Sequence, residues 1–279
     1  MFSRRHLLKL VFLLTACNTA KISRPGKLTI GVISYGEGEQ SIKQYQSLVN
    51  YLAAELKSVI ELEPVYNEVK ALEQVRRKTW SLVFAPPGLA ALAISEVRYL
   101  PLFPLEGVEK TRSVIVVRQE SSIKKLGDLS NQVIALDQPG SATGYYLPIQ
   151  NLSGLTLAEV RFAPTPKTVL QWIDNKEVVA GALSLDELEH YRLDFSKTQF
   201  RVIQTDSVPP GSILVGPTVD QYQQEQIRRA LKSASPTIAE AAGYLPNAEV
   251  PDYQKLIEIV ARVKRISKRI KEKPAPIEK

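Results

Sequence analysis

The sequence is poor in the side chains on which most catalytic and metal sites depend. Its 279 residues include one cysteine, Cys17, and two histidines, His6 and His190. A single cysteine excludes an internal disulfide, and no two histidines have the spacing of a zinc motif. Neither a Gly-x-Ser-x-Gly elbow nor a Gly-Lys-Ser/Thr phosphate loop is present. We therefore expect neither an enzyme nor a resident metal or cofactor.

Long apolar runs are also missing. The apolar stretch at residues 7–14 is interrupted by Lys9, follows Arg4 and Arg5, and is too short to cross a bilayer. A charged start, a short apolar stretch and small residues before Cys17 are typical of a secretory signal. We expect residues 1–16 to be a signal peptide and residues 17–27 to be a tether.

The Leu-Thr-Ala-Cys run at residues 14–17 resembles the bacterial lipobox, in which the cysteine is acylated. This resemblance implies a lipid on Cys17 that anchors the exported protein to a membrane; the alternative is an incidental cysteine. Residues 3–9 also resemble a twin-arginine export signal, so the sequence leaves the export route open.

The formal net charge of +7 comes largely from the two ends of the chain. Basic residues crowd positions 262–279, where we expect a helix end that runs into a disordered basic tail at 271–279. Such a tail can contact phospholipid headgroups or nucleic acid. We expect no nucleic-acid partner, because an exported protein rarely meets one.

Strand-like and helix-like patterns alternate through the body of the chain. Apolar, strand-like runs lie at residues 28–33, 59–65, 82–85, 113–117, 133–136, 160–162, 178–183 and 212–215, and helical spacing occurs between many of them. This alternation favours an α/β fold with mostly parallel sheets. We expect lobe 1 at 28–112 and 212–270 and lobe 2 at 113–211, with two hinge crossovers and a ligand cleft between the lobes.

Residues 127–129 and 133–145 carry a resemblance to a known family. The run Ala-Leu-Asp-Gln-Pro-Gly-Ser-Ala-Thr-Gly-Tyr at 135–145 resembles the Ser-Thr-Ser-Gly segment of phosphate/phosphite/phosphonate-type ABC-transporter binding lipoproteins. The resemblance implies a two-lobed, type 2 periplasmic-binding-protein fold. It also implies a monomer outside the cytoplasmic membrane that delivers a phosphonate, phosphite, phosphate or related small oxyanion to an ABC permease.

The hydroxyl groups of Ser141 and Thr143 lie where a strand gives way to a helix start. Backbone N–H groups and hydroxyls at such a point can bind an oxyanion, and Gly140 and Gly144 permit close backbone approach. The alternative is an ordinary helix cap, in which the hydroxyls serve their own helix.

Other cleft positions are expected from the same architecture. The complete set of expected ligand contacts is Ser141, Thr143, Gly144, Tyr145, Tyr35, Pro86, Thr165, Lys167 and Ser184. Asp186 is as well placed to cap a helix as to contact ligand. If Glu37 or Glu39 reaches the cleft, an amine on the ligand matches better than a bare anion.

Three departures from the family pattern bear on specificity. Ala142 replaces a hydroxyl residue, Lys167 stands near a position where relatives have histidine, and Val179 stands near a position where relatives have an acid. Two alternatives therefore stay open: a sensor or accessory lipoprotein with the same fold, and a binding-protein-like scaffold that has lost its ligand.

Overall fold

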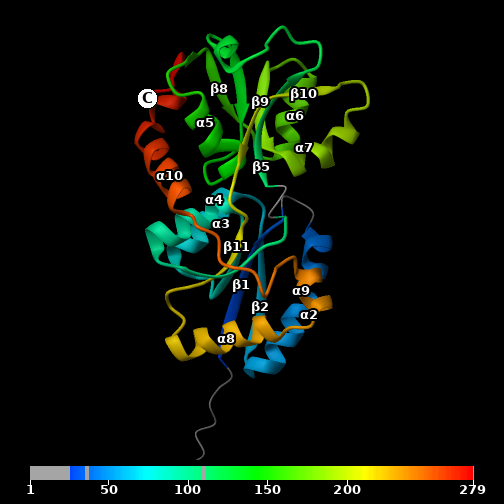
Figure 1. The fold of residues 1–279 in the computed structure, drawn as a ribbon, viewed down its shortest axis with the longest axis vertical. Helices are drawn as coiled ribbons and strands as arrows, with labels where there is room; N and C mark the ends of the chain where they lie inside the picture. The colour runs from blue at the N-terminus through cyan, green and yellow to red at the C-terminus, as the bar shows by residue number, and fades with distance from the viewer. Residues whose placement is uncertain (1–25, 35–37, 108–110, 279) are drawn as a thin grey trace, which may run out of the picture.

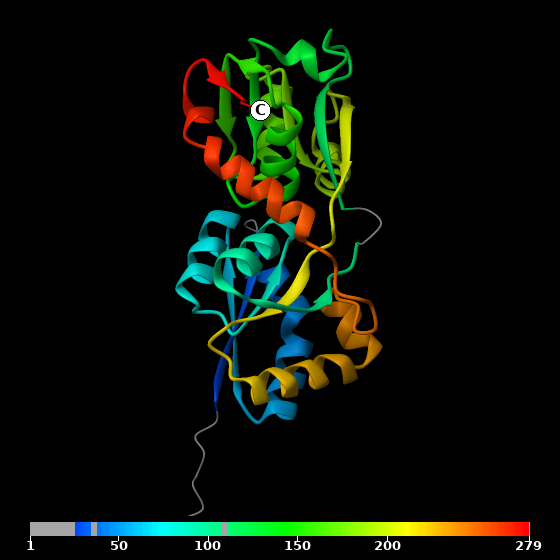
Figure 2. The ribbon, with the colours of Figure 1, turned by 60° about the vertical axis from the view of Figure 1, so that its left-hand side comes forward.

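The protein consists of two α/β lobes arranged along its long axis (Figures 1 and 2). The computed structural model describes residues 26–34, 38–107 and 111–278. The signal peptide, Cys17, Tyr35 and Glu37 lie outside these residues, so the predictions made for them stay predictions. Within the described ranges, no helix has the length and apolar character needed to span a membrane.

The sheet of lobe 1 has five strands in the order β2-β1-β3-β11-β4. These are β1 (Lys27–Ile33), β2 (Val59–Val65), β3 (Leu82–Ala85), β4 (Leu100–Pro104) and β11 (Ser212–Val215). Alternate residues of β3 point to opposite faces, as the pleat of a strand requires. Leu82 and Phe84 join one apolar core, whereas Val83 and Ala85 join the other.

Helices cover both faces of this sheet. One face carries α2 (Gly38–Leu56), α8 (Gln221–Ser233) and α9 (Pro236–Ala242), and the other carries α3 (Glu68–Arg77), α4 (Pro87–Leu92) and the following turn η2 (Ala93–Val97). The bounds predicted for β2 and β3 are those of the structure. They could be predicted because residues that cap a helix or break a strand flank each apolar run.

The sheet of lobe 2 also has five strands, in the order β10-β5-β9-β6-β8. These are β5 (Arg112–Arg118), β6 (Val133–Leu136), β8 (Glu159–Phe162), β9 (Ala180–Ser184) and β10 (Phe200–Ser207). One face is covered by α6 (Pro166–Asp174) and α7 (Leu185–Tyr191), and the other by the helical turn η4 (Ala142–Tyr146) with α5 (Leu147–Asn151). Short helical turns lie at η3 (Leu126–Leu129) and η5 (Arg192–Asp194).

The expectation of mostly parallel sheets is wrong, because both sheets are mixed. β1 pairs in parallel with β2 and β3, and β6 with β8 and β9, but β11 and β5 run antiparallel to their neighbours. The reason is that β5 and β11 are the strands that follow the two crossovers. Each of them starts at the junction between the lobes and runs away from it, whereas the other strands of its sheet run toward the junction and end there.

The expected disordered tail at 271–279 is also wrong for the residues that the structure describes. After α10 (Gln254–Ile266) and the turn η6 (Arg269–Lys271), strand β12 (Ala275–Pro276) pairs with β7 (Thr156–Leu157) of lobe 2. Ile270, Ala275 and Ile277 are buried. The basic and proline residues around them obscured these apolar positions in the sequence.

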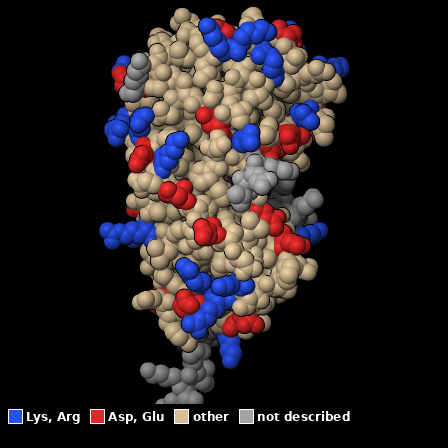
Figure 3. Space-filling view, in the orientation of Figure 1, with Lys and Arg blue, Asp and Glu red and all other residues tan. Residues whose placement is uncertain are grey.

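Charged side chains are distributed unevenly over the molecule. Figure 3 shows acidic side chains over the middle of one face, between basic groups nearer both ends.

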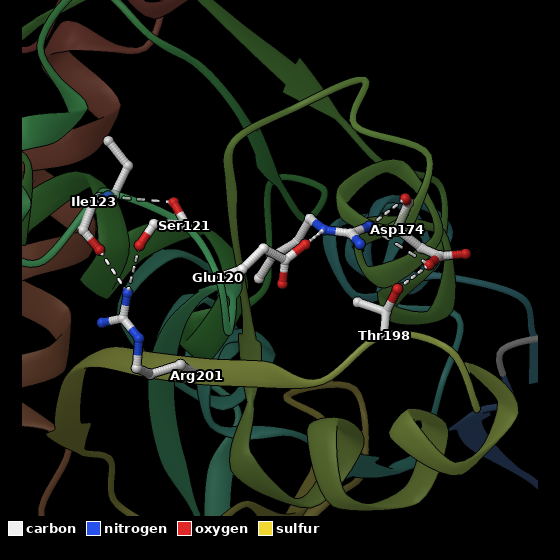
Figure 4. Close-up of polar contacts among 7 residues, drawn as sticks. Glu120, Ser121, Ile123, Asp174, Thr198 and Arg201 are labelled. Atoms are coloured by element: carbon white, nitrogen blue, oxygen red, sulfur yellow. Dashed lines mark hydrogen bonds and ion pairs between the residues drawn. The ribbon is translucent and has the colours of Figure 1, made fainter.

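At the outer end of lobe 2, Arg118 donates to Glu120 at 2.5 Å, and Arg201 donates to the carbonyl oxygens of Ser121 and Ile123 (Figure 4). These bonds hold the loop after β5 against the sheet, so the outer end of lobe 2 is well tied.

Candidate functional site

A cavity of about 120 Å³ lies between the two lobes. Its lining comes from both of them: Glu68, Pro86, Pro87 and Thr111, and then Ser141, Ala142, Thr143, Ser184, Asp186 and Glu187. The volume is below the roughly 300–1,000 Å³ of sites for drug-sized ligands. The cavity therefore has room for a small ligand only.

The lining residues reach the cavity because of where they stand in the βα units. Glu68 begins α3, Pro86 precedes α4, Ser141 caps η4 and Ser184 caps α7. Glu68, Pro86 and Ser141 follow the carboxyl ends of β2, β3 and β6, and Ser184 is the last residue of β9. In open α/β sheets ligands bind at such strand ends. The topology therefore gathers four helix starts around one small space.

One wall of the cavity is rich in hydroxyl groups. Ser141 Oγ accepts a hydrogen bond from the backbone N–H of Gly144 at 3.0 Å and lies 3.4 Å from Thr143 Oγ1. Ser113 Oγ donates to the carbonyl oxygen of Thr143 at 2.6 Å. The Ser141 hydroxyl thus serves its own helix as a cap and also borders the cavity, and its contact with a ligand stays a prediction.

The lobes touch through backbone atoms beside this wall. A Cβ atom added to Gly88 would lie 2.1 Å from the carbonyl oxygen of Gly140, and one added to Gly140 would lie 2.7 Å from Cβ of Glu68. Gly140 has a φ of +122°, a conformation that favours glycine. Ser141 and Thr143 are 6% and 8% exposed, so the described arrangement is a closed one.

The cavity lining is also acidic. Glu68, Asp186 and Glu187 contribute carboxyl groups to the lining, and the part of the chain that the structure describes adds no lysine, arginine or histidine to it. Glu187 also forms a capping box with Ser184, because its Oε2 accepts from the backbone N–H of Ser184 at 2.7 Å. Glu68 is 2% exposed.

A further buried carboxyl group lies behind the hydroxyl wall. Asp137 follows β6 and is 1% exposed. Its Oδ1 accepts a hydrogen bond from the backbone N–H of Gln138 at 2.7 Å. Its Oδ2 has no hydrogen-bond partner among the described residues. Burial, and then the negative charges of Glu68 and Glu187, raise the pKa of Asp137 well above its usual range. Burial also raises the pKa of Glu187. Both carboxyl groups therefore favour their protonated form more than an exposed carboxyl group does.

The structure brings some of the expected contacts together. Ser141, Thr143, Pro86 and Ser184 all line the cavity, and so does Asp186. Their role in ligand binding stays a prediction.

Four expected contacts lie elsewhere in the structure. Thr165 caps α6 by accepting from the N–H of Thr168, and Lys167 forms an exposed ion pair with Asp194 at 2.6 Å. Gly144 packs against Asp137, and Tyr145 is buried among other aromatic rings. None of these four is in the cavity lining.

Glu68, Thr111 and Glu187 were not predicted as lining residues. Glu68 follows Asn67, whose side chain caps α3, so it reads as an ordinary acid in the first turn of a helix. A usable signal was its position shortly after the end of a strand, since β2 ends at Val65.

A larger hollow of about 540 Å³ lies near the end of lobe 2, lined by Gln119, Arg192, Leu193, Phe195, Ser196, Thr198, Gln199 and Phe200. It lies away from the strand ends that face lobe 1, so we take the smaller interlobe cavity as the candidate site. No group of three or more His, Cys, Asp or Glu in the described chain could hold a metal ion.

Comparison with known proteins agrees with this architecture. A family model described as "ABC transporter, phosphonate, periplasmic substrate-binding protein" matches residues 30–266. The chain belongs to this family. Its members are periplasmic substrate-binding proteins of ABC transporters. The match confirms the family that the sequence resembles, and the two-lobed α/β fold expected from the sequence is confirmed as well.

Solved structures share the fold at low sequence identity. XAC2383 from Xanthomonas citri, bound to chloride, is 20% identical, with a TM-score of 0.71 over 86% of this chain and 99% of its own. PhnD1 from Prochlorococcus marinus, in complex with methylphosphonate, is 15% identical, with a TM-score of 0.68 over 87% and 100%. A binding protein component of an ABC phosphonate transporter from Pseudomonas aeruginosa is 12% identical, with a TM-score of 0.68 over 89% and 90%. A search of curated proteins gave no match.

Proposed function

We propose that this protein binds a small phosphonate that also carries an ammonium group, and delivers it to an ABC permease. The observation that supports this proposal is the combination of hydroxyl and carboxyl groups in one small lining. Ser141 and Thr143 offer hydroxyl groups, and Glu68, Asp186 and Glu187 offer carboxyl groups. A ligand with one anionic end and one cationic end complements both kinds of group.

A bare anion fits the same space poorly. Two unit charges 4 Å apart interact by about 4 kcal/mol at the effective dielectric typical of sites near a protein surface. Several carboxylates would therefore repel phosphate or phosphite unless they were protonated. An ammonium group reverses the sign of this interaction, and for that reason 2-aminoethylphosphonate is our first choice among phosphonates, phosphite and phosphate.

Thermal shift measurements test this choice. Ligand at 100 times its Kd stabilises a protein by about 2.7 kcal/mol, which raises Tm by roughly 5–10 °C for a chain of this size. We expect this shift with 2-aminoethylphosphonate and a smaller one with methylphosphonate, phosphite or phosphate. An equal or larger shift with methylphosphonate would show that the carboxyl groups do not select an amine.

A matched pair of variants locates the effect. Glu68→Gln keeps the size of the side chain and removes its charge, so affinity for 2-aminoethylphosphonate should fall at least about tenfold. Glu73→Gln is the control, because Glu73 lies on the same helix, outside the cavity lining, and pairs with Lys70 at the surface. Similar losses in both variants would contradict the proposed role of Glu68.

A second candidate function is a scaffold that no longer binds a ligand. The internal hydrogen bonds of Ser141 and Thr143 and the close approach of Gly88 to Gly140 favour it, because they occupy the corner with protein atoms. It predicts no thermal shift with any of the four probes. A sensor with the same fold would bind a ligand but act on a membrane partner other than a permease.

We also propose that the chain is a monomer, without catalytic activity, anchored by a lipid on Cys17. The support for the anchor is the run of residues before Cys17. Mass spectrometry of protein from membranes should show an acylated N-terminal cysteine, and Cys17→Ser should release the protein. Membrane retention of Cys17→Ser would contradict the anchor.

A further inference from the structure

The segment from Tyr253 to Glu278 contacts both lobes. Its helix α10 leaves lobe 1 and runs along the side of lobe 2, as the orange and red ribbon in Figure 2 shows. α10 contacts α4 of lobe 1 and also α5 and η4 of lobe 2. The chain therefore makes a third connection between the lobes, besides the two crossovers expected from the sequence.

The contacts of α10 include a continuous apolar core. Leu256, Val260 and Val263 are buried in a cluster that also contains Leu89 of α4 and Tyr146 of η4. This cluster extends from lobe 1 through α10 into lobe 2. Because α4 and η4 both supply walls of the ligand cavity at their starts, α10 packs against the elements that border the cavity on both sides.

The start of the segment is fixed beside a crossover. Tyr253 is buried, its hydroxyl group donates to the carbonyl oxygen of Pro210 at 2.7 Å, and it lies 2.8 Å from Ser212 Oγ. Pro210 and Ser212 lie where the chain returns to lobe 1 at β11. α10 therefore begins at the junction itself.

The far end of the segment is fixed to lobe 2. β12 pairs with β7, the N–H of Gly154 donates to the carbonyl oxygen of Ile277 at 2.6 Å, and the N–H of Ile277 donates to that of Leu155 at 2.9 Å. Lys273 forms an ion pair with Glu159 at 2.8 Å. Backbone pairing and the buried Ala275 and Ile277 hold this end of the segment to lobe 2.

The middle of α10 is also attached to lobe 1, through the apolar contact with α4 and an ion pair between Lys264 and Glu96 of η2. Glu96 also pairs with Arg76 of α3 at 3.0 Å, which is a contact within lobe 1. Partial burial would raise the pKa of Glu96, but hydrogen bonds from Lys264 and Arg76 lower it overall, so this carboxyl group is ionised at neutral pH.

We propose that residues 253–278 form an interlobe strap that holds the protein in its closed arrangement, and that the cleft opens by sliding of α10 over α4. β12 stays paired with lobe 2 during this motion, and the ion pair between Lys264 and Glu96 breaks. The strap acts without a ligand, so it stands or falls independently of the proposed function.

Distance measurements between spin labels on the two lobes test the strap. Tyr222 in lobe 1 and Leu193 in lobe 2 are 74% and 77% exposed, so each can be replaced by a labelled cysteine in residues 17–279 carrying Cys17→Ser. With no ligand added, the otherwise unchanged chain should give a narrow peak from closed molecules that is larger than any peak from open molecules. A larger open population, or one broad distribution, would overturn the proposal.

Two alanine variants separate the strap from ordinary surface pairing. Lys264→Ala removes the pair between strap and lobe 1, whereas Arg76→Ala removes the neighbouring pair within lobe 1. Exposed ion pairs have modest energies, so we expect Lys264→Ala to raise the ratio of open to closed molecules roughly twofold to fivefold. Arg76→Ala should leave the distribution unchanged, and equal effects of the two would refute the role of the strap.

Removing residues 274–279 tests the other attachment. The deletion removes β12 with the buried Ala275 and Ile277, so the interlobe distribution should broaden more than in Lys264→Ala. An unchanged distribution in a folded protein would contradict the proposal. If circular dichroism shows that the shortened chain does not fold, the comparison of Lys264→Ala with Arg76→Ala decides the question.

Discussion

Gly88→Ala should open the cleft. The added methyl group would lie 2.1 Å from the carbonyl oxygen of Gly140 and 2.6 Å from the backbone nitrogen of Ala142, both on the opposite lobe. Ordinary contacts begin near 3.4 Å, so the two backbones must separate by about 1 Å. Backbone atoms cannot rotate away as a side chain can, and the strain is therefore relieved by movement of one lobe relative to the other.

The size of this effect follows from the cost of overpacking. Inserting a methylene group into a well-packed contact typically costs about 1–3 kcal/mol, and each 1.4 kcal/mol is a factor of ten in an equilibrium. The ratio of closed to open molecules should fall roughly fivefold to 150-fold, and ligand affinity should fall by up to the same factor. The two lobes would move apart beside Pro87 and Ser141, which both line the cavity.

Spin-label distances between Tyr222 and Leu193 and the affinity for 2-aminoethylphosphonate measure this effect together. Gly127→Ala is the matched control, since a Cβ atom at Gly127 has no neighbour within 4 Å. It should leave both quantities unchanged. If Gly88→Ala keeps the distance distribution of the unaltered chain, the lobes do not meet as described and the reasoning fails.

Three further predictions concern single residues. Asp137→Asn should raise Tm at neutral pH. The pKa of Asp137 is raised in the folded protein, so folding favours the protonated form, and stability is lost as the pH rises from the ordinary value of 3.8 through the folded pKa. The difference in Tm between the variant and the unaltered chain should therefore shrink as the pH is lowered toward 3.8. A constant gap would contradict this. Lys167→Ala should leave ligand affinity unchanged in titration calorimetry and cost at most about 1 kcal/mol in denaturant unfolding, because Lys167 pairs with Asp194 at the surface; a tenfold loss of affinity would place it in the site after all. Tyr253→Phe should lower the free energy of unfolding by about 1–3 kcal/mol, because it leaves the buried Ser212 hydroxyl short of a partner, and no change in denaturant midpoint would refute this.

Much of the fold could be predicted from local sequence patterns. The strands at Val59–Val65 and Leu82–Ala85 have the ends that apolar runs and breaking residues indicate. The direction of β5 and β11 could not be predicted in this way, because it depends on where the chain returns from the other lobe. β12 was missed because two buried positions among proline and basic residues give no periodic signal.

The candidate site was only half predictable. Ser141 and Thr143 were found because hydroxyl residues at a strand-to-helix turn have a recognisable chemistry. Glu68 and Glu187 were missed because an acid in the first turn of a helix is common for purely local reasons. Only the packing of one lobe against the other brings these helix starts around one cavity.

A crystal structure of the protein grown with 2-aminoethylphosphonate is the most direct test of the proposed function. We expect the ligand between the lobes, with phosphonate oxygens within hydrogen-bond distance of the Ser141 and Thr143 hydroxyl groups and the ammonium group beside Glu68 or Glu187. A ligand turned with its phosphonate toward these carboxyl groups, or bound outside the interlobe cavity, would contradict it.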